Sequence, residues 1–288
     1  MRKRLTNFIL ILIFLAGLSL LLYPSFSNWW NSWHQSRAIA SYSEQVANMD
    51  EDKYNELWDA AIAYNESLLS RSNSYILTEE QLEEYTELLN VGGNGVMGYI
   101  DIPIIGVTLP IYHGTSDSVL QVAVGHLDWT SLPTGGESTH TVLSGHRGLP
   151  SARLFTDLDD LIVGDTFMLR ILDEVLTYEV DKIRIVEPHV TEDLLIEEGK
   201  DYCTLVTCTP YGINSHRLLV RGHRIETAEE ARVVRITADA VQIDPMIVAP
   251  VVAVPILLVL LIMLLLQGSG SKKKKKKKQG GDADAPKK

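Results

Sequence analysis

Cysteine is scarce in this chain, which has two among its 288 residues, Cys203 and Cys208. They lie five positions apart in one β-branched, extended segment, so their side chains point to opposite faces and lie roughly 16 Å apart. A disulfide between them is excluded, because bridged α-carbons are separated by less than about 7 Å. No CxxC or HxxxH pairing accompanies them. The sequence therefore predicts no metal site, and nothing in it indicates a cofactor.

Basic residues are scarce in the middle of the chain. The net charge of the whole chain, −11, hides this because basic residues are concentrated at its two ends. Residues 1–26 and 267–288 hold 12 of the 26 basic residues but two of the 37 acidic ones, which leaves 14 basic against 35 acidic residues between them. A region so acidic repels phosphate, which excludes nucleic acid as a partner.

Long apolar runs are confined to the two ends. The first, Phe8–Leu22, follows a basic triplet, and as a helix it spans about 22 Å, short of a ~30 Å hydrocarbon core. It is either a signal-peptide core or part of a longer helix that reaches an aromatic cluster ending at Trp33. We favour an uncleaved anchor within residues 1–35.

The second run, 246–266, is a predicted transmembrane helix, joined to the middle of the chain by a polar connector, 227–245. A basic tail, 267–288, follows it. Because both apolar runs are flanked by basic residues at the chain ends, we expect both tails in the cytoplasm and the acidic middle outside the cell, next to the lipid membrane.

Helical periodicity marks residues 36–95. Apolar positions from Ile39 to Leu68 recur every three or four residues, which predicts one amphipathic helix, or two broken near Asp50–Asp52. A capping box from Thr78 to Gln81 predicts a further helix start. Its buried stripe is expected to consist of Leu82, Tyr85, Leu88 and Leu89.

From residue 96 to 226 the period becomes that of short strands separated by glycine and proline, which predicts a mainly β domain closed into a barrel. Short helical turns are expected at 116–122, 152–158 and 191–196. The expected strands are 96–102, 107–112, 140–145, 166–172, 176–186, 202–208 and 217–225.

Three residues at strand ends suggest chemistry. Cys208 ends a strand, Arg217 opens the next one, and His146 closes an earlier one. Together they can supply a nucleophile, a proton carrier and an oxyanion donor. A free thiol has a pKa of ~8.5 and is only a few per cent thiolate at neutral pH, so the cysteine needs such a helper. Whether the resting pair is ionic or neutral stays open.

Other assignments compete with these. Cys203 is expected to be a small buried hydrophobe. Arg221 shares a strand face with Arg217 and is the alternative arginine, although it can instead reach an acidic surface. A phosphatase-like Cys-x5-Arg loop is excluded because position 214 is asparagine.

The segment 204–222, TLVTCTPYGINSHRLLVRG, resembles the signature of sortases, the cysteine transpeptidases of Gram-positive cell surfaces. The continuation after Cys208, TPYGINSHRL, is similar to class C, the pilus-assembling branch. The resemblance extends back through VGHLDWTSLPTGGESTHTVLSGHRGLPSARLFTDLDDLIVGD and covers about residues 64–225.

This resemblance implies an eight-stranded barrel with helical insertions. It implies Cys208 as nucleophile, His146 as general acid and base, and Arg217 as the group that stabilises the oxyanion and the substrate. His126, Thr207 and Thr209 are expected to line the substrate site. The implied reaction cleaves a Leu-Pro-x-Thr-Gly sorting signal through a thioester and passes the acyl group to a pilin lysine.

One departure from class C concerns the lid, which in that class carries an Asp-Pro-aromatic motif before the barrel. The matching stretch here, residues 70–77, has no such motif, and Tyr75 is its only aromatic residue and the lid candidate.

Two further functions stay open. One is a sortase that anchors surface proteins to peptidoglycan, and the other is a non-catalytic scaffold that holds pilins. The sequence leaves the oligomeric state and the particular pilin open.

Overall fold

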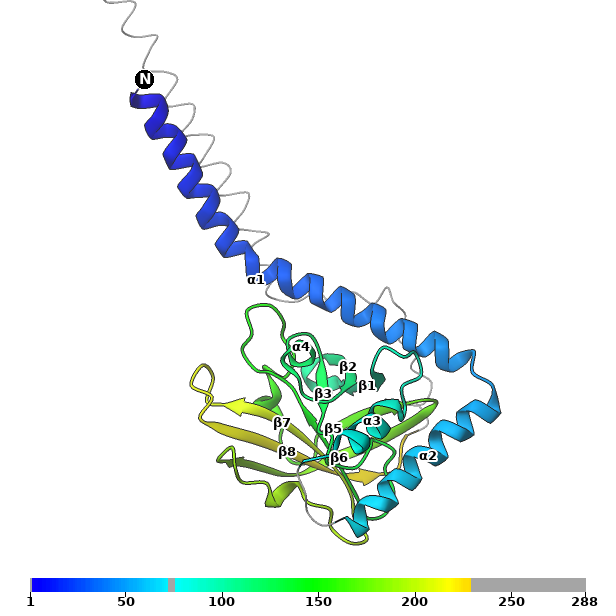
Figure 1. The fold of residues 1–288 in the computed structure, drawn as a ribbon. Helices are drawn as coiled ribbons and strands as arrows, with labels where there is room; N and C mark the ends of the chain where they lie inside the picture. The colour runs from blue at the N-terminus through cyan, green and yellow to red at the C-terminus, as the bar shows by residue number, and fades with distance from the viewer. Residues whose placement is uncertain (1, 72–75, 229–288) are drawn as a thin grey trace, which may run out of the picture. The chain divides into compact units, whose positions relative to one another are not determined.

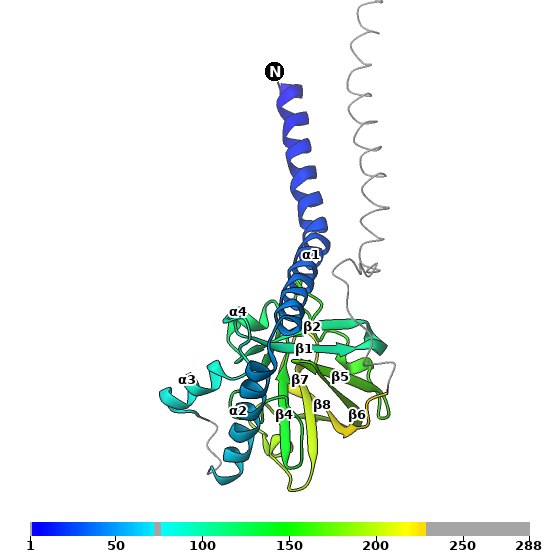
Figure 2. The same ribbon diagram turned by 90° about the vertical axis from the view of Figure 1, so that its right-hand side faces the viewer.

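The structure is a computed structural model that describes residues 2–71 and 76–228 (Figures 1 and 2). It shows three α-helices followed by a β-rich domain with short helical insertions. The predicted transmembrane helix 246–266, the basic tail and Tyr75 lie outside the described residues. The elements are α1 (Arg2–Ala47), α2 (Glu51–Ser70), α3 (Glu79–Glu87), β1 (Val96–Ile102), η1 (Pro103–Ile105), β2 (Val107–His113), α4 (Asp117–Leu120), β3 (Val124–His126), β4 (Thr139–Ser144), η2 (Leu158–Asp160), β5 (Thr166–Ile171), β6 (Glu174–Val186), η3 (Glu192–Leu194), β7 (Asp201–Thr209) and β8 (His216–Ile225).

The eight strands close into a barrel in the order β1-β2-β3-β4-β7-β8-β6-β5, which confirms the predicted architecture. Two of the pairings, β2 with β3 and β4 with β7, are parallel, and the others within the barrel are antiparallel. Because β4 and β7 run in the same direction, their carboxyl ends lie at one edge of the barrel. Strand β8 runs the other way and begins at that edge.

Seven of the strands match the predicted ones to within two residues at each end. The exception is β3, which the sequence did not predict. It consists of three residues, Val-Gly-His, and is too short to show an alternating pattern.

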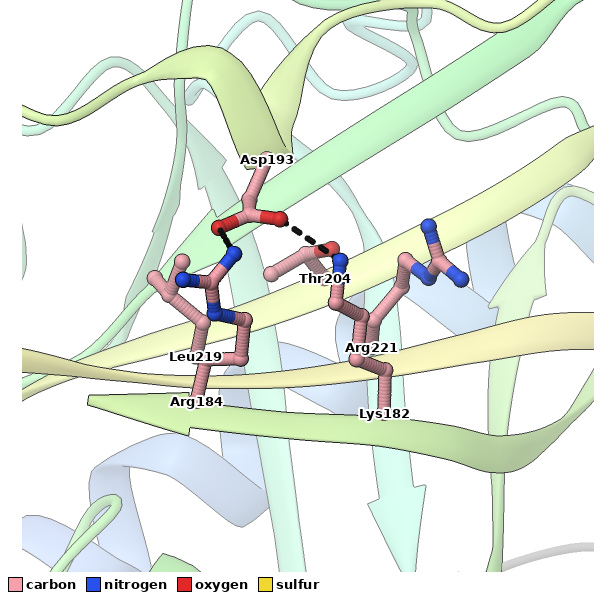
Figure 3. Close-up of a pocket in the computed structure, with 6 residues that line it drawn as sticks. All are labelled: Lys182, Arg184, Asp193, Thr204, Leu219 and Arg221. Atoms are coloured by element: carbon pink, nitrogen blue, oxygen red, sulfur yellow. Dashed lines mark hydrogen bonds and ion pairs between the residues drawn. The ribbon is translucent and has the colours of Figure 1, made fainter. Parts of the chain in front are cut away.

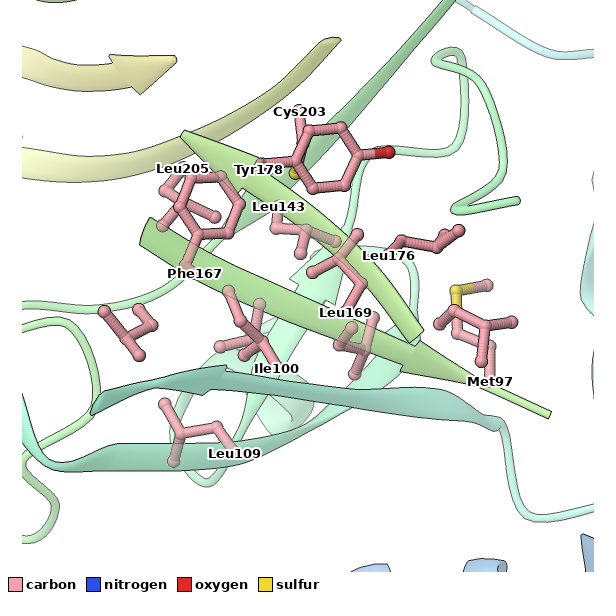
Figure 4. Packing of buried hydrophobic residues seen from close by; sticks show 14 of the residues in the cluster. Met97, Ile100, Leu109, Leu143, Phe167, Leu169, Leu176, Tyr178, Cys203 and Leu205 are labelled. Atoms are coloured by element: carbon pink, nitrogen blue, oxygen red, sulfur yellow. The ribbon is translucent and has the colours of Figure 1, made fainter. Parts of the chain in front are cut away.

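Side chains of alternate strand residues fill the barrel interior. Figure 4 shows Phe167 and Tyr178, from β5 and β6, in the same interior as Cys203 and Leu205 of β7. All four are fully buried. The other face of β7, which carries Val206, belongs to a separate apolar cluster on the outside of the barrel.

Helices α2 and α3 complete the main core. Of the two alternatives for this region, the structure has the one with a break near residue 50, where Asp50 caps the start of α2 by accepting a hydrogen bond from the Lys53 amide at 2.8 Å. The capping box of α3 forms as expected. Its predicted stripe is only partly correct, because Tyr85 and Leu89 are fully buried whereas Leu82 is 43% exposed. Helix α3 has only nine residues, and Tyr85 is the one among them that is buried.

Helix α1 continues past Leu22 and through Pro24, as the longer of the two alternatives for the N-terminal run requires. Among the described residues, 8–47 form the one helix long and apolar enough to cross a membrane, with a mean hydropathy of 2.4 in its most apolar window. Length and composition alone also fit a signal sequence. Residues up to Ser25 belong to a different compact unit from the one that begins at Phe26 and contains the barrel.

A buried asparagine fastens α2 to the loop that precedes β4. The Asn65 side chain donates to the Leu132 carbonyl at 3.0 Å and to the Thr134 hydroxyl at 2.9 Å, and it accepts from the Leu132 amide at 2.7 Å. Asn65 and Leu132 are both buried, so water cannot replace these bonds.

We therefore expect Asn65→Ala to lower the free energy of unfolding by about 2–4 kcal/mol, because it leaves buried backbone groups unpaired. Asn55→Ala is the matched control, since Asn55 is exposed on the same helix. Denaturation of the full-length chain in detergent measures both. Equal stability of the two variants would contradict the role given to Asn65.

Candidate active site

The barrel edge described above gathers the three predicted reactive residues. Cys208 is the penultimate residue of β7, and its partner across the antiparallel ladder is Arg217. His146 lies two residues beyond the end of β4. The Gly145 amide donates to the Val206 carbonyl at 3.0 Å, and the Thr207 hydroxyl donates to the Gly145 carbonyl at 2.8 Å. The chain entering His146 is thus bonded to the two residues that precede Cys208.

The two cysteines differ in accessibility. Cys208 is partly exposed, whereas Cys203 is fully buried in the barrel interior. Burial raises the pKa of the Cys203 thiol well above its ordinary value, so this thiol stays protonated and unreactive. The alternation along β7 therefore places the two thiols on opposite faces, as the sequence predicts.

The arginines are engaged in different ways. Arg221 pairs with Asp181 at 2.9 Å and with Glu197 at 3.2 Å, and its guanidinium lies 4.0 Å from the centre of the Tyr202 ring. Within residues 2–71 and 76–228, the hydrogen bonds of the Arg217 side chain run from Nη1 to two nearby carbonyls, those of Asn214 at 3.3 Å and His216 at 3.1 Å. Arg221 is thus committed to an ion-pair network, and Arg217 is the arginine beside Cys208.

The loop after His146 folds back on itself. The Phe155 amide donates to the His146 carbonyl at 3.1 Å, and the Gly148 amide donates to the Thr156 hydroxyl at 3.2 Å. Arg147 forms an ion pair with Asp159. These bonds fix the backbone on both sides of the histidine.

The three residues expected to line the substrate site are all buried. His126 is fully buried, Thr207 is 1% exposed and Thr209 is 7% exposed. The Thr207 hydroxyl is used to hold Gly145. His126 and Thr207 thus have almost no free surface, and direct contact of these three residues with a substrate stays a prediction. The sequence shows that these residues lie near the site but not which way their side chains point.

His126 is a fully bonded neutral histidine. Its Nε2 donates to the Ser131 carbonyl at 2.8 Å, and its Nδ1 accepts from the Tyr85 hydroxyl at 2.9 Å. Burial lowers the pKa of His126 to about 3. Through these two hydrogen bonds, His126 of β3 is connected to Tyr85 of α3 and to Ser131 in the loop after β3. Because its pKa is so low, His126 cannot act as a proton carrier near neutral pH.

A buried apolar cluster on the outer face of the barrel escaped the sequence analysis. Val142, Val206 and Leu219, from β4, β7 and β8, form its floor. Val206 and Leu219 each lie two residues from a predicted catalytic residue on the same strand face, so the floor leads away from Cys208 and Arg217. Leu194, from the loop between β6 and β7, packs onto it together with Trp129.

Charged residues fasten that β6–β7 loop to the barrel. Asp193 of η3 accepts from Lys182 at 2.7 Å and from Arg184 at 2.8 Å, and these two cations lower its pKa (Figure 3). His140 donates through Nδ1 to the Leu195 carbonyl at 2.8 Å, and its Nε2 accepts from Thr204 at 2.7 Å. The alternating charges of β6 and η3 were visible in the sequence, but their pairing requires the fold.

Comparison with known proteins identifies the family. The sortase domain model matches residues 100–225. The crystal structure of sortase C1 from Streptococcus agalactiae is 52% identical, with a TM-score of 0.65 over 67% of this chain and all of that chain. Sortase C from Streptococcus pneumoniae is 47% identical, with a TM-score of 0.60 over 66% of this chain and 97% of that chain. The chain belongs to the sortase family of cysteine transpeptidases.

Within that family, these similar solved structures are class C sortases. Sortase D from Bacillus subtilis is 32% identical over 44% of this chain, and sortase A from Streptococcus agalactiae is 31% identical over 54% of it. The chain spans 63% and 62% of the length of these two curated relatives.

Buried histidines make the stability of the fold depend on pH. Burial lowers the pKa of His140 to about 4, beside the value of about 3 for His126. An unfolded histidine has a pKa near 6.5, so between about pH 6.5 and 4 the unfolded chain binds protons that the folded chain does not. Stability therefore falls as the pH is lowered through this window.

We expect each of these histidines to cost on the order of 2 kcal/mol of stability between pH 7 and pH 5. His126→Gln should remove about half of the loss that the pair causes. His189→Gln, at a side chain that is 77% exposed, serves as the control and should leave the dependence as it is. Denaturation midpoints at several pH values test this, and an unchanged slope in His126→Gln would contradict it.

Proposed function

We propose that this chain is a membrane-tethered transpeptidase that cleaves a Leu-Pro-x-Thr-Gly-type sorting signal and transfers the acyl group to a lysine amine of a pilin. The observation that carries the proposal is the placement of Cys208 directly opposite Arg217, with the chain entering His146 bonded to the same strand. Identity of 43–52% to class C structures, against 31–32% to the curated sortases A and D, supports the pilin branch.

In the first half-reaction, the Cys208 thiolate attacks the threonine carbonyl carbon of the sorting signal. The carbonyl oxygen becomes an oxyanion, and Arg217 donates hydrogen bonds to it. His146 gives its proton to the leaving glycine nitrogen as the peptide bond breaks. The products are a thioester on Cys208 and a released amine. The carbonyls that Arg217 contacts are neutral, and they hold its guanidinium less strongly than a carboxylate would.

In the second half-reaction, a lysine amine attacks the thioester carbonyl. His146 takes a proton from the attacking nitrogen, and the thiolate leaves as the new amide forms. The proton balance closes, because the histidine regains the proton it lost in the first half. The membrane tether keeps this chemistry beside substrates that are themselves held at the cell surface.

The decisive experiment is to incubate the full-length chain in detergent with a Leu-Pro-x-Thr-Gly peptide, then to add either a lysine peptide or a peptidoglycan stem peptide. An acyl-enzyme mass that passes to the lysine peptide supports the proposal. Transfer to the stem peptide alone indicates an anchoring sortase. The absence of any acyl-enzyme indicates a non-catalytic scaffold.

Replacement of each cysteine separates the nucleophile from the core thiol. We expect Cys208→Ala to lower peptide cleavage by roughly a thousandfold or more while preserving the fold, because the residue lies at a strand end. Cys203→Ala should retain activity and lose on the order of 1 kcal/mol of stability through a small cavity. Peptide cleavage and thermal unfolding are measured for both. A comparable loss of activity in the two variants would sink the assignment.

The proposed topology has both tails in the cytoplasm and the barrel outside the cell, which the apolar part of α1 supports at the N-terminal end. Protease added to intact cells should therefore digest the region between about residues 35 and 240 and spare a tag placed after Lys288. The tag is detected by blotting, with lysed cells as the control. Loss of the tag from intact cells would overturn the cytoplasmic placement of the C-terminal tail.

A further inference from the structure

The loop between β7 and β8 carries an exposed tyrosine three residues after Cys208. Tyr211 is 62% exposed. Its backbone is fixed in a tight turn, because the Ile213 and Asn214 amides both donate to the Pro210 carbonyl, at 3.1 and 3.0 Å. The Asn214 carbonyl at the end of this turn accepts from Arg217. The turn therefore follows Cys208 closely in the chain, and its last residue is hydrogen-bonded to the guanidinium of Arg217.

The Tyr211 ring rests on the α-carbon of Gly148. A β-carbon added at Gly148 would lie 2.5 Å from Cε2 of the ring and 2.9 Å from Cζ, which is closer than any side chain permits. Gly148 also has a φ of +74°, in the left-handed region that favours glycine. Two features therefore favour glycine at position 148, the positive φ of its backbone and the close approach of the Tyr211 ring.

Gly148 belongs to the loop of His146, two residues further along the chain. The contact with Tyr211 therefore connects the loop that carries the histidine to the loop that joins the cysteine and the arginine. Other bonds of the His146 loop are internal, from the Phe155 amide and to the Thr156 hydroxyl, or run to α1, where Asn31 donates to the Ser151 carbonyl at 2.8 Å and Asn28 accepts from the Arg153 amide at 3.0 Å. Among the described residues, none of these bonds reaches the β7–β8 loop.

We propose that Tyr211 is a positioning residue, whose ring holds the loop that carries His146 against the β7–β8 loop, which connects Cys208 to Arg217. The inference rests on the proposed function, because it assigns Tyr211 a part in that reaction. Proton transfer needs heavy atoms within about 2.6–3.2 Å, and a displacement of 1 Å can lower a rate by about a hundredfold. The exposed hydroxyl is not needed for this role, since the contact is made by ring carbons.

The first measurement is the kinetics of sorting-peptide cleavage by the full-length chain in detergent, with kcat expressed per thiol of Cys208 that reacts with iodoacetamide. Tyr211→Ala is expected to lower kcat at least about tenfold and to change KM by less than about twofold. Tyr211→Phe should keep kcat within about twofold of the unaltered chain. Ile213→Ala is the matched control, because Ile213 is 72% exposed in the same turn, and it should leave both constants unchanged.

A double-mutant cycle tests the contact itself. Gly148→Ala should also lower kcat, because the new β-carbon displaces the ring. Combined with Tyr211→Ala, it should add less than it does alone, since the ring it displaces is then absent and only the backbone strain at position 148 remains. Fully additive losses would overturn the coupling. A raised KM in both Tyr211→Ala and Tyr211→Phe would overturn it in favour of direct substrate contact through the hydroxyl.

Hydrogen exchange gives a test that does not depend on turnover. Amides of residues 146–155 should exchange faster in Tyr211→Ala than in the unaltered chain and at an unchanged rate in Tyr211→Phe. Unchanged exchange in Tyr211→Ala overturns the inference even if the peptide is cleaved. If the unaltered chain forms no thioester, the proposed function fails, while faster exchange in Tyr211→Ala still supports the coupling of the two loops.

Discussion

The parallel pairing of β4 with β7 is the constraint on which the rest of the site depends. Six residue pairs, from Thr139 with Asp201 to Ser144 with Val206, fix the register of the two strands. A parallel pair brings both carboxyl ends to one edge, and the antiparallel β8 returns from that edge. Residues separated by 62 positions in the chain thereby become neighbours. A shift of one residue in the register of β7 would send Cys208 into the barrel interior and bring Cys203 to the outer face.

Much of the barrel could be predicted from the sequence because its strands are bounded by glycine and proline and rich in β-branched residues. The capping box identified the helix start at Thr78, because capping depends on a side chain and an amide three residues away, whereas the cap at Asp50 was found only in the structure. Strand β3 could not be found, since three residues carry no period. The burial of individual helix residues was harder to predict, because the surface against which a helix packs is made by strands far away in the sequence. Leu82, which was expected to be buried and is exposed, is an example.

The candidate site shows a similar division. Strand ends and the resemblance pointed to Cys208, His146 and Arg217, and the ladder between β7 and β8 distinguishes Arg217 from the alternative, Arg221. The orientation of His126, the apolar floor beside Cys208 and the ion pairs around Asp193 all depend on contacts between strands and loops far apart in sequence. Local pattern cannot determine such contacts, because each partner alone is an ordinary surface or core residue.

The β6–β7 loop illustrates how electrostatics and packing cooperate at the site. Leu194 is inserted into the apolar floor, while Asp193 beside it is held by two cations and Leu195 by a buried histidine. Three consecutive residues thus use three different interactions. This combination packs the β6–β7 loop onto the outer face of the barrel beside β7.

The separation of the two thiols has a practical meaning for work with the protein. One thiol lies at a strand end and is partly exposed, the other is enclosed by aromatic and aliphatic side chains, and the sequence contains no third cysteine. The number of thiol-specific mass tags on each chain therefore distinguishes folded molecules from molecules whose barrel has opened. One tag per chain reports a closed barrel with an accessible reaction centre, and a second tag reports that the barrel has opened.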